Sequence, residues 1–363
     1  MFLDRVALVA VDHPEEAEVF PNEGLTAPPR PPNHLYVARG ALPPLSATDH
    51  GGRDVLDSLT DLDREYVDGL PLHRVRGYAE EHGLTLDLGA AGDGRDLLLL
   101  TGWTDYAFSS DNVAAHQTGR RLMPPRIEVQ DEHGRWRAVG SAGIPVGRPQ
   151  TVPFDLSGKW LGPSRKVRVT TNMRIYWDQI LAARPVGASL EVRSTTLEPT
   201  LAELSERGFS LELSPDGREP FGYDYERVAW HSPWKSMPGR YTRLGDVREL
   251  LLGADDMFVI SRPGDDVALS FDAADLPPLP RGWRRTFLVY ADGYSKEMDI
   301  NSATPHSVEP LPFHGMSRYP YAAPESFPWT KELRESMERY NTRVVSRPVP
   351  PLELVIAQMR AAQ

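Results

Sequence analysis

Short segments in which apolar and polar residues alternate recur along most of the chain, and Gly, Pro, Asn or Asp separates them. They include LTLDLG at 84–89, LLLLTGW at 97–103, TVPFDLSG at 151–158 and KVRVTTNMRIYWDQI at 166–180. Alternation predicts strands with one buried face, whereas the unbroken leucine run predicts a strand buried on both faces. Such strands, separated by turn residues, predict an antiparallel sandwich of the jelly-roll kind.

Two hairpins and a helix are expected beside these strands. The segment RIEVQDEHGRWRAV at 126–139 alternates on both sides of a His-Gly turn, which predicts a hairpin. Residues 3–20 predict a second hairpin, with its turn at Asp12-His13-Pro14. Apolar residues at helical spacing predict a short helix over 54–67. The proline-rich segment 27–32 lacks too many backbone donors for a sheet and is expected to be an extended tether.

The second half of the chain repeats part of this order. Matching phrases follow one another in the same sequence, which predicts a diverged internal duplication. If WDQI ends one sandwich, LDRV should end an earlier one, so we expect the chain to be part of a larger architecture. The matches are Asp54-Val55 with Asp246-Val247, Asp63 with Asp255, Tyr66-Val67 with Phe258-Val259, LTLDLG with VALSFD at 267–272, LLLLTGWTDYAFSS with TFLVYADGYSKEMD at 286–299, and WDQI at 177–180 with LDRV at 3–6.

The expected fold is therefore mainly β, with two antiparallel sandwiches as a diverged tandem repeat, and the module from LTLDLG to IYWD resembles a galactose-binding-like sandwich. Residues 1–40 would complete or continue a sandwich, residues 41–183 form the first module and residues 184–309 the second. Residues 310–363, rich in Pro and aromatics, are expected to form an irregular arm with a helix over 330–340 that Thr330 caps. His314 is expected to fix this arm by hydrogen bonds.

Composition narrows the classes of function. A formal net charge of -11 disfavours binding to nucleic acid or anionic membranes. With no cysteine, the chain has no thiol nucleophile, no disulfide and no Cys-ligated zinc or iron–sulfur site. Neither a signal peptide nor an apolar run long enough to span a membrane is present. As written, the chain is expected to be cytoplasmic, or extracytoplasmic if it is a fragment of a longer secreted protein.

Several phrases resemble the C-terminal region of bacterial FG-GAP repeat proteins of the ASPIC/UnbV type, and the resemblance spans nearly the whole chain. The chain lacks the tandem calcium-loop repeats of the propeller and the ASPIC motif itself. The resemblance implies a noncatalytic β module of a larger protein and supplies no catalytic residue. The phrases are LDRVALVAVDHP, GRDVL, TGWTDYAFSSDNVAAHQ, TNMRIYWDQI, FLVYADGYSKEMD and LPFHGM.

A mixture of aromatic and short polar residues follows the leucine-rich strand. Sugar sites need an aromatic face for the C–H side of the ring and polar side chains for the hydroxyls. Alternatively, the aromatics fill the core while the polar residues satisfy loop backbone. The candidate ligand-binding residues are Trp103, Asp105, Tyr106, Asn112, His116 and Gln117, joined by Asn172 and Tyr176 from a closing strand.

Two further sets of carboxylates have less specific patterns. Asp49, Asp54, Asp61 and Asp63 could hold a structural calcium ion, although they lack the EF-hand spacing and the pattern favours a solvated helix face and cap. No other cofactor is expected. Asp224 and Glu226 share one strand face and could act as the carboxylate pair of a glycosidase, or lie on an ordinary exposed strand.

No motif in the sequence specifies a reaction, because the nucleophile elbow, dinucleotide turn, phosphate loop and His-Glu-x-x-His helix are all absent. The first hypothesis is a nonenzymatic β-sandwich protein that binds carbohydrate or a neighbouring protein module. The alternatives are an enzyme acting on a glycan or a secondary metabolite, and a purely structural scaffold.

Overall fold

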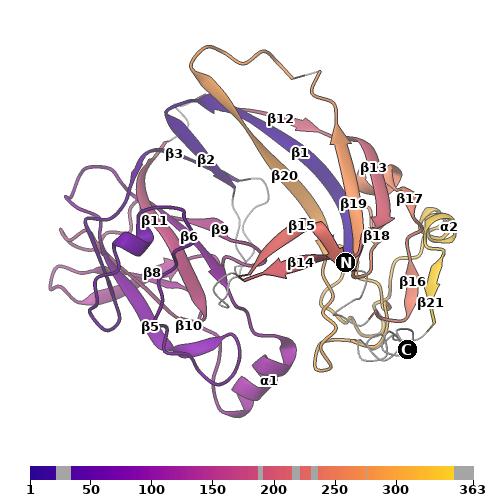
Figure 1. Ribbon diagram of the computed structural model, residues 1–363, viewed down its shortest axis with the longest axis horizontal. Coiled ribbons are helices and arrows are strands. Elements are labelled where there is room, and N and C mark those ends of the chain that lie inside the picture. The colour runs from indigo at the N-terminus through magenta and orange to yellow at the C-terminus, as the bar shows by residue number, and fades with distance from the viewer. Residues whose placement is uncertain (22–33, 187–190, 215–220, 230–235, 275, 347–363) are drawn as a thin grey trace. The chain divides into compact units, whose positions relative to one another are not determined.

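The computed structural model is mainly β, which confirms the predicted fold class (Figure 1). It describes all residues except 22–33, 187–190, 215–220, 230–235, 275 and 347–363. The described residues form two compact units. Unit 1 draws on Met1–Val11, Ser194–Pro278 and Phe287–Gln363, and unit 2 on Asp12–Arg193 and Leu279–Thr286.

Two five-stranded antiparallel sheets build unit 2, in the orders β4-β5-β10-β7-β8 and β2-β3-β11-β6-β9. One core cluster contains residues of both sheets, such as Leu86 and Val169 from the first and Leu98 and Leu100 from the second. The sheets therefore pack face to face as a sandwich. The strands are β2 (Ala17–Pro21), β3 (Leu35–Leu42), β4 (Ser46–Asp49), β5 (Tyr78–Asp87), β6 (Leu97–Thr104), β7 (Arg126–Gln130), β8 (Trp136–Ser141), β9 (Gln150–Asp155), β10 (Lys166–Met173) and β11 (Ile175–Pro185). A 3₁₀ helix, η1 (Asp57–Leu59), and helix α1 (Ser109–Gln117) complete the unit.

The leucine-rich strand β6 is buried on both faces, as predicted. Leu98 and Leu100 point into the core between the sheets, while Leu97 and Leu99 belong to a second cluster with Ala38 and Ala183. Burying a leucine side chain contributes roughly 1.5–3 kcal/mol. The predicted hairpin over 126–139 is confirmed as β7–β8, in which Gln130 pairs with Trp136.

Unit 1 contains sheets with fewer strands. Their orders are β12-β1-β18, with β20 also paired to β1, and β17-β13-β19, β14-β15 and β16-β21. β1 (Phe2–Pro14) and β20 (Trp283–Tyr294) each contribute residues to both units. The other strands are β12 (Arg193–Leu197), β13 (Pro199–Glu206), β14 (Phe209–Leu213), β15 (Gly222–Ala229), β16 (Gly239–Tyr241), β17 (Gly245–Asp246), β18 (Val259–Ile260), β19 (Asp265–Phe271) and β21 (Arg343–Val345). The helices are η2 (Arg248–Leu251) and α2 (Lys331–Tyr340).

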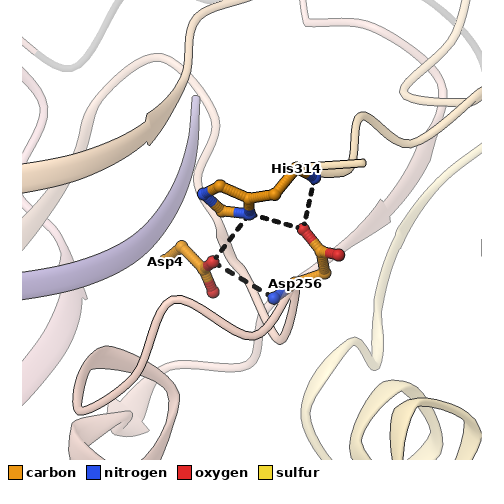
Figure 2. Close-up of side chains that lie close together, drawn as sticks. All are labelled: Asp4, Asp256 and His314. Atoms are coloured by element: carbon orange, nitrogen blue, oxygen red, sulfur yellow. Dashed lines mark hydrogen bonds and ion pairs between the residues drawn. The ribbon is translucent and has the colours of Figure 1, made fainter. Parts of the chain in front are cut away.

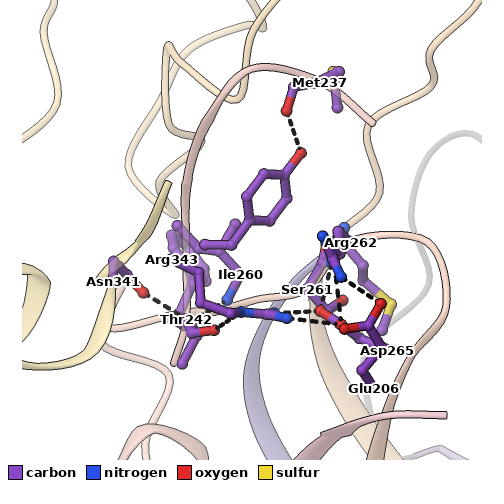
Figure 3. Close-up of polar contacts among 12 residues, drawn as sticks. Glu206, Met237, Thr242, Ile260, Ser261, Arg262, Asp265, Asn341 and Arg343 are labelled. Carbon is purple, nitrogen blue, oxygen red and sulfur yellow. Dashed lines mark hydrogen bonds and ion pairs between the residues drawn. The ribbon is translucent and has the colours of Figure 1, made fainter. Parts of the chain in front are cut away.

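Residues 311–346 belong to unit 1, where Leu311, Phe313 and Phe327 lie in a core cluster. Helix α2 begins where Thr330 Oγ1 accepts a hydrogen bond from Leu333 N–H at 3.1 Å, which confirms the predicted cap. Just after the helix, Arg343 forms an ion pair with Asp265, and Thr242 Oγ1 donates to Asn341 Oδ1 at 2.7 Å (Figure 3). These buried polar contacts tie the end of α2 to the strands of unit 1.

Two sequence predictions are wrong. Residues 3–20 do not form a hairpin, because β1 and β2 lie in different sheets. The segment 54–67 forms only the 3₁₀ helix η1 instead of a longer helix. Its backbone N–H groups bond elsewhere: Arg64 N–H donates to Asp178 and Val67 N–H donates to Trp177 O. Tertiary hydrogen bonds thus replace the helical ones. The predicted tether at 27–32 lies outside the described residues.

The same local arrangement occurs in both units. In unit 2, Val55 N–H donates to Ala47 O at 3.0 Å just before η1, and in unit 1 Val247 N–H donates to Ala202 O at 2.9 Å just before η2. β4 pairs with β5 so that Ala47 faces Leu86, and β13 pairs with β19 so that Ala202 faces Leu269. The segments LTLDLG in β5 and VALSFD in β19 therefore hold equivalent positions in the two units, in the register that the sequence matches predict. These matches support the internal duplication, while the duplication of complete sandwiches stays a prediction.

Candidate functional site

Three partly exposed aromatic rings lie in a row in unit 2. We call Tyr66, Trp103 and Tyr176 the aromatic row. Trp103 and Tyr176 face each other on β6 and β11, with ring centroids 5.9 Å apart, and the Tyr66 ring meets the Tyr176 ring edge-on at 6.4 Å. None of the three belongs to a buried core cluster. Two of the predicted ligand-binding residues, Trp103 and Tyr176, are therefore together at the surface of unit 2.

Asp105 lies directly after β6 and is part of a network of ion pairs. Its side chain is buried and forms ion pairs with Arg76 at 2.9 Å and with Arg174 at 3.2 Å. Arg174 also donates to the backbone carbonyls of His73 and Tyr78. The Asp105 carboxylate is thus already matched by two guanidinium groups, and its contribution is to hold the loops around β5 and β6 together.

The remaining predicted residues divide into bonded and exposed groups. Asn112 accepts from Tyr78 Oη at 2.8 Å, and Asn172 binds the loop between α1 and β7 through Met123 N and Arg121 O. By contrast, Tyr106, His116 and Gln117 are exposed around helix α1. Both asparagine side chains satisfy internal backbone or hydroxyl groups, so they offer little to a sugar hydroxyl in this conformation.

The carboxylates proposed for enzyme chemistry lie on the two-stranded ribbon β14–β15. Asp224 Oδ1 accepts from Glu226 N–H at 3.0 Å and from Arg227 N–H at 3.3 Å. Glu226 is exposed. Asp224 therefore stabilises a local turn of the backbone at the irregular pairing between the two strands.

The four carboxylates considered for calcium have separate structural roles. Asp49 accepts from Arg53, Asp54 from Leu56 N–H and Asp63 from Glu65 N–H, while Asp61 is exposed. Among the described residues, one group of three or more His and acidic side chains has its ligand atoms close enough to share a metal ion, and none of these four belongs to it. That group is Asp4, Asp256 and His314 in unit 1.

We define the Asp–His cluster as Asp4, Asp256, Asp292 and His314, of which Figure 2 shows Asp4, Asp256 and His314. His314 Nδ1 lies 2.7 Å from Asp256 Oδ1 and 3.5 Å from Asp4 Oδ2, and its Nε2 lies 3.1 Å from Asp292 Oδ1. Asp4 comes from β1, Asp256 from the turn before β18, Asp292 from β20 and His314 from the arm. As predicted, His314 fixes the arm by hydrogen bonds, and both of its ring nitrogens take part.

Burial and neighbouring charges shift the pKa values of this cluster. Burial raises the pKa of Asp4 to about 6, against the hydrogen bond that Asp256 N–H donates to it. Burial lowers the pKa of His314, but its hydrogen bonds to Asp256 and Asp292 outweigh that effect, so the net shift is upward. The surrounding carboxylates therefore favour the protonated, positively charged form of His314.

Unit 2 contains a counterpart of the buried Asp4. Asp178 is also fully buried, and it accepts from Arg64 N–H at 2.9 Å as Asp4 accepts from Asp256 N–H at 3.1 Å. Arg64 and Asp256 have the same left-handed backbone, with φ of 71° and 68°. Two sequence features indicated this pair of buried aspartates. They are the match of WDQI with LDRV, which contain Asp178 and Asp4, and the equal offsets of Asp63 and Asp255. No short motif joins four residues so far apart in the chain.

Comparisons with known proteins supply no relative, since no family model, curated protein or solved structure matches the chain. None of the helices in the described part of the chain has the length and apolar character needed to cross a membrane.

Proposed function

We propose that the protein is a nonenzymatic β-rich binding protein, and that the aromatic row of unit 2 binds an extended, proline-containing segment of a partner protein module. The observation that carries this proposal is that the aromatic rings of unit 1 at the equivalent positions are covered by another segment of the chain. There, a Pro- and aromatic-rich segment of the chain itself covers the equivalent rings.

The equivalence rests on the strand backbone. A Cβ on Gly102 would lie 2.6 Å from Tyr176 O, and a Cβ on Gly293 would lie 2.1 Å from Phe2 O. The two glycines thus occupy matching close approaches between neighbouring strands, and Trp103 corresponds to Tyr294, the residue after the glycine.

In unit 1 the corresponding rings are Phe2, Phe258 and Tyr294, with centroids 5.9 Å apart in each successive pair. Phe2 and Phe258 share one core cluster with Leu311 and Phe313 of the arm, and Tyr294 packs against that cluster. Extended proline-containing segments dock well on aromatic surfaces because little conformational entropy is lost. The aromatic row of unit 2 presents the same kind of surface in a partly exposed state.

Carbohydrate is the second candidate for the same surface. Trp103, which is partly exposed, and Tyr106, which is nearby in sequence and 47% exposed, provide an aromatic platform for a sugar ring. The polar side chains that should bind the hydroxyls, Asn112 and Asn172, are instead bonded within unit 2. For this reason the polypeptide ligand is favoured over the sugar.

Replacing Trp103 by alanine is expected to weaken binding of a peptide with the sequence of residues 309–318 by more than about tenfold, because aromatic anchors dominate such interfaces. Binding would be measured by fluorescence anisotropy of the labelled peptide added to the intact chain. Trp136→Ala, which removes a tryptophan elsewhere in unit 2, should leave the affinity unchanged.

A glycan array run in parallel separates the two ligands. Saturable glycan binding lost in the Trp103→Ala protein, without peptide binding, would replace the polypeptide proposal by the carbohydrate one. A folded protein that binds neither probe would contradict the binding function of the aromatic row.

A further inference from the structure

The Asp–His cluster differs from its unit 2 counterpart in charge. In unit 2, the residue that donates its backbone N–H to the buried Asp178 is Arg64, so a cation is built into the chain. In unit 1 this position is Asp256, which adds a carboxylate where the other copy has a guanidinium. Because Gly293 of unit 1 is equivalent to Gly102 of unit 2, Asp292, which precedes Gly293, is equivalent to Thr101. The arrangement in unit 1 has therefore lost one positive charge and gained two negative ones.

Among the described residues, His314 is the only basic side chain that the structure shows in contact with these carboxylates. Its side chain is 36% exposed, so water and ions can reach it. Asp4, by contrast, is fully buried, and its carboxylate points toward His314 and Asp256 (Figure 2). Its Oδ2, which lies 3.5 Å from His314 Nδ1, accepts from Asp256 N–H, while its Oδ1 has no hydrogen-bond partner in the described part of the chain, as is also true of Asp178 Oδ2 in unit 2. An unpartnered buried carboxylate oxygen is costly unless a cation or a donor satisfies it.

We propose that Asp4, Asp256 and His314 bind a divalent transition-metal ion such as Zn²⁺, with His314 Nδ1 and one oxygen of each aspartate as ligands. The three ligand atoms already lie within 4.8 Å of one another. Imidazole nitrogen with carboxylate oxygen suits Zn²⁺ or Mn²⁺ and disfavours Ca²⁺, which takes oxygen ligands.

The distances fit such an ion after a small movement. Ligand atoms about 2.0–2.1 Å from a tetrahedral Zn²⁺ are roughly 3.3 Å apart. The 3.5 Å between His314 Nδ1 and Asp4 Oδ2 is close to this value, and the 2.7 Å between Nδ1 and Asp256 Oδ1 must widen by about half an ångström. That widening occurs when the ion replaces the hydrogen-bonded proton between the two atoms.

Asp292 completes the arrangement without contacting the ion. It lies 3.1 Å from His314 Nε2 and also accepts from Tyr290 Oη at 3.1 Å. A carboxylate on the far nitrogen fixes the tautomer that leaves Nδ1 unprotonated for the metal. With three protein ligands and a partly exposed histidine, the fourth position is open to water or to an exogenous ligand. The ion would join β1, the turn before β18 and the arm.

The test is titration of the untagged, chelator-treated chain with Zn²⁺ at neutral pH by isothermal calorimetry, followed by Co²⁺ substitution and visible absorption spectroscopy. One ion per chain is expected, together with the visible bands of nitrogen- and oxygen-coordinated Co²⁺. Ca²⁺ should give no saturable heat at the same concentrations.

Two variants remove the site in different ways. His314→Gln deletes the nitrogen ligand, and Asp256→Arg installs the residue that unit 2 carries at the same backbone conformation. Both should weaken Zn²⁺ binding about 100-fold or more, since each removes a direct ligand. Asp178→Asn is the matched control, because it alters the equivalent buried carboxylate in unit 2 and should leave Zn²⁺ affinity unchanged.

Each outcome decides the proposal. Stoichiometric binding lost in both site variants and kept in the control supports it. Absence of stoichiometric binding in the parent chain overturns it, as does full affinity in His314→Gln. If Asp256→Arg fails to fold, the Co²⁺ spectrum of His314→Gln still gives a decision, since the bands should disappear from a folded protein.

Discussion

Replacing Arg174 by leucine is expected to lower the free energy of unfolding of unit 2 by about 3 kcal/mol. Removing one partner of a buried ion pair has a cost of this size, because the other charge stays buried without it. The Arg174 side chain is 15% exposed, and Asp105 beneath it is 2% exposed. Without the guanidinium, the Asp105 carboxylate and the carbonyls of His73 and Tyr78 lose a charged donor that water cannot replace.

Arg76→Leu provides the comparison for this change. Arg76 contacts the same carboxylate, but its side chain is 46% exposed, so its ion pair is screened by solvent. We expect a loss of under about 1 kcal/mol. Urea unfolding, with hydrogen exchange of the β6 and β10 amides to localise the effect, measures both. Equal losses in the two variants would show that Asp105 does not depend on its buried partner.

The second large effect is expected at Gly77, where alanine should destabilise unit 2 by about 3 kcal/mol or more through strain and overlap. Gly77 has a φ of +77°, and a Cβ there would lie 2.2 Å from Ala107 N. The nearest atoms are N, Cα and Cβ of Ala107, so relief requires movement of the loop that follows β6.

Gly119 separates the two contributions to this cost. It has the same φ of +77°, but a Cβ there meets no atom within 4 Å. Gly119→Ala should therefore cost only the backbone strain, about 1 kcal/mol. Thermal unfolding of both variants tests the difference, and similar shifts in Tm would contradict the close approach of Gly77 to Ala107.

The sequence predicts the fold best where one local pattern determines the structure. The leucine run of β6, the alternation in β7–β8 and the Thr330 cap of α2 each depend on a few neighbouring residues, and the structure confirms all three. Periodicity decides such elements because the buried face follows directly from the spacing of apolar residues.

The errors arise where distant contacts override local preference. Residues 54–67 have helical spacing, yet the buried Asp178, which lies more than a hundred positions along the chain, takes the N–H of Arg64. The expected hairpin over 3–20 fails for the same reason, since β1 pairs with β12, β18 and β20 instead of β2. Neither partner can be recognised from the segment itself.

The candidate sites show the same division. The aromatic side chains Trp103 and Tyr176 do meet, because they lie opposite each other on the paired strands β6 and β11. The polar residues grouped with them are bonded internally, which depends on loop geometry that the spacing does not specify. The Asp–His cluster gathers residues from β1, a turn, β20 and the arm, so only the comparison of the two repeats gave any indication of it.

X-ray diffraction at the zinc absorption edge, from crystals grown with one equivalent of Zn²⁺, tests most directly whether unit 1 holds a cation where unit 2 has Arg64. We expect one dominant anomalous peak at about 2.1 Å from His314 Nδ1, with carboxylate oxygens of Asp4 and Asp256 at similar distances. A peak at any other place, or an ordered cluster with no anomalous peak, would contradict the metal site.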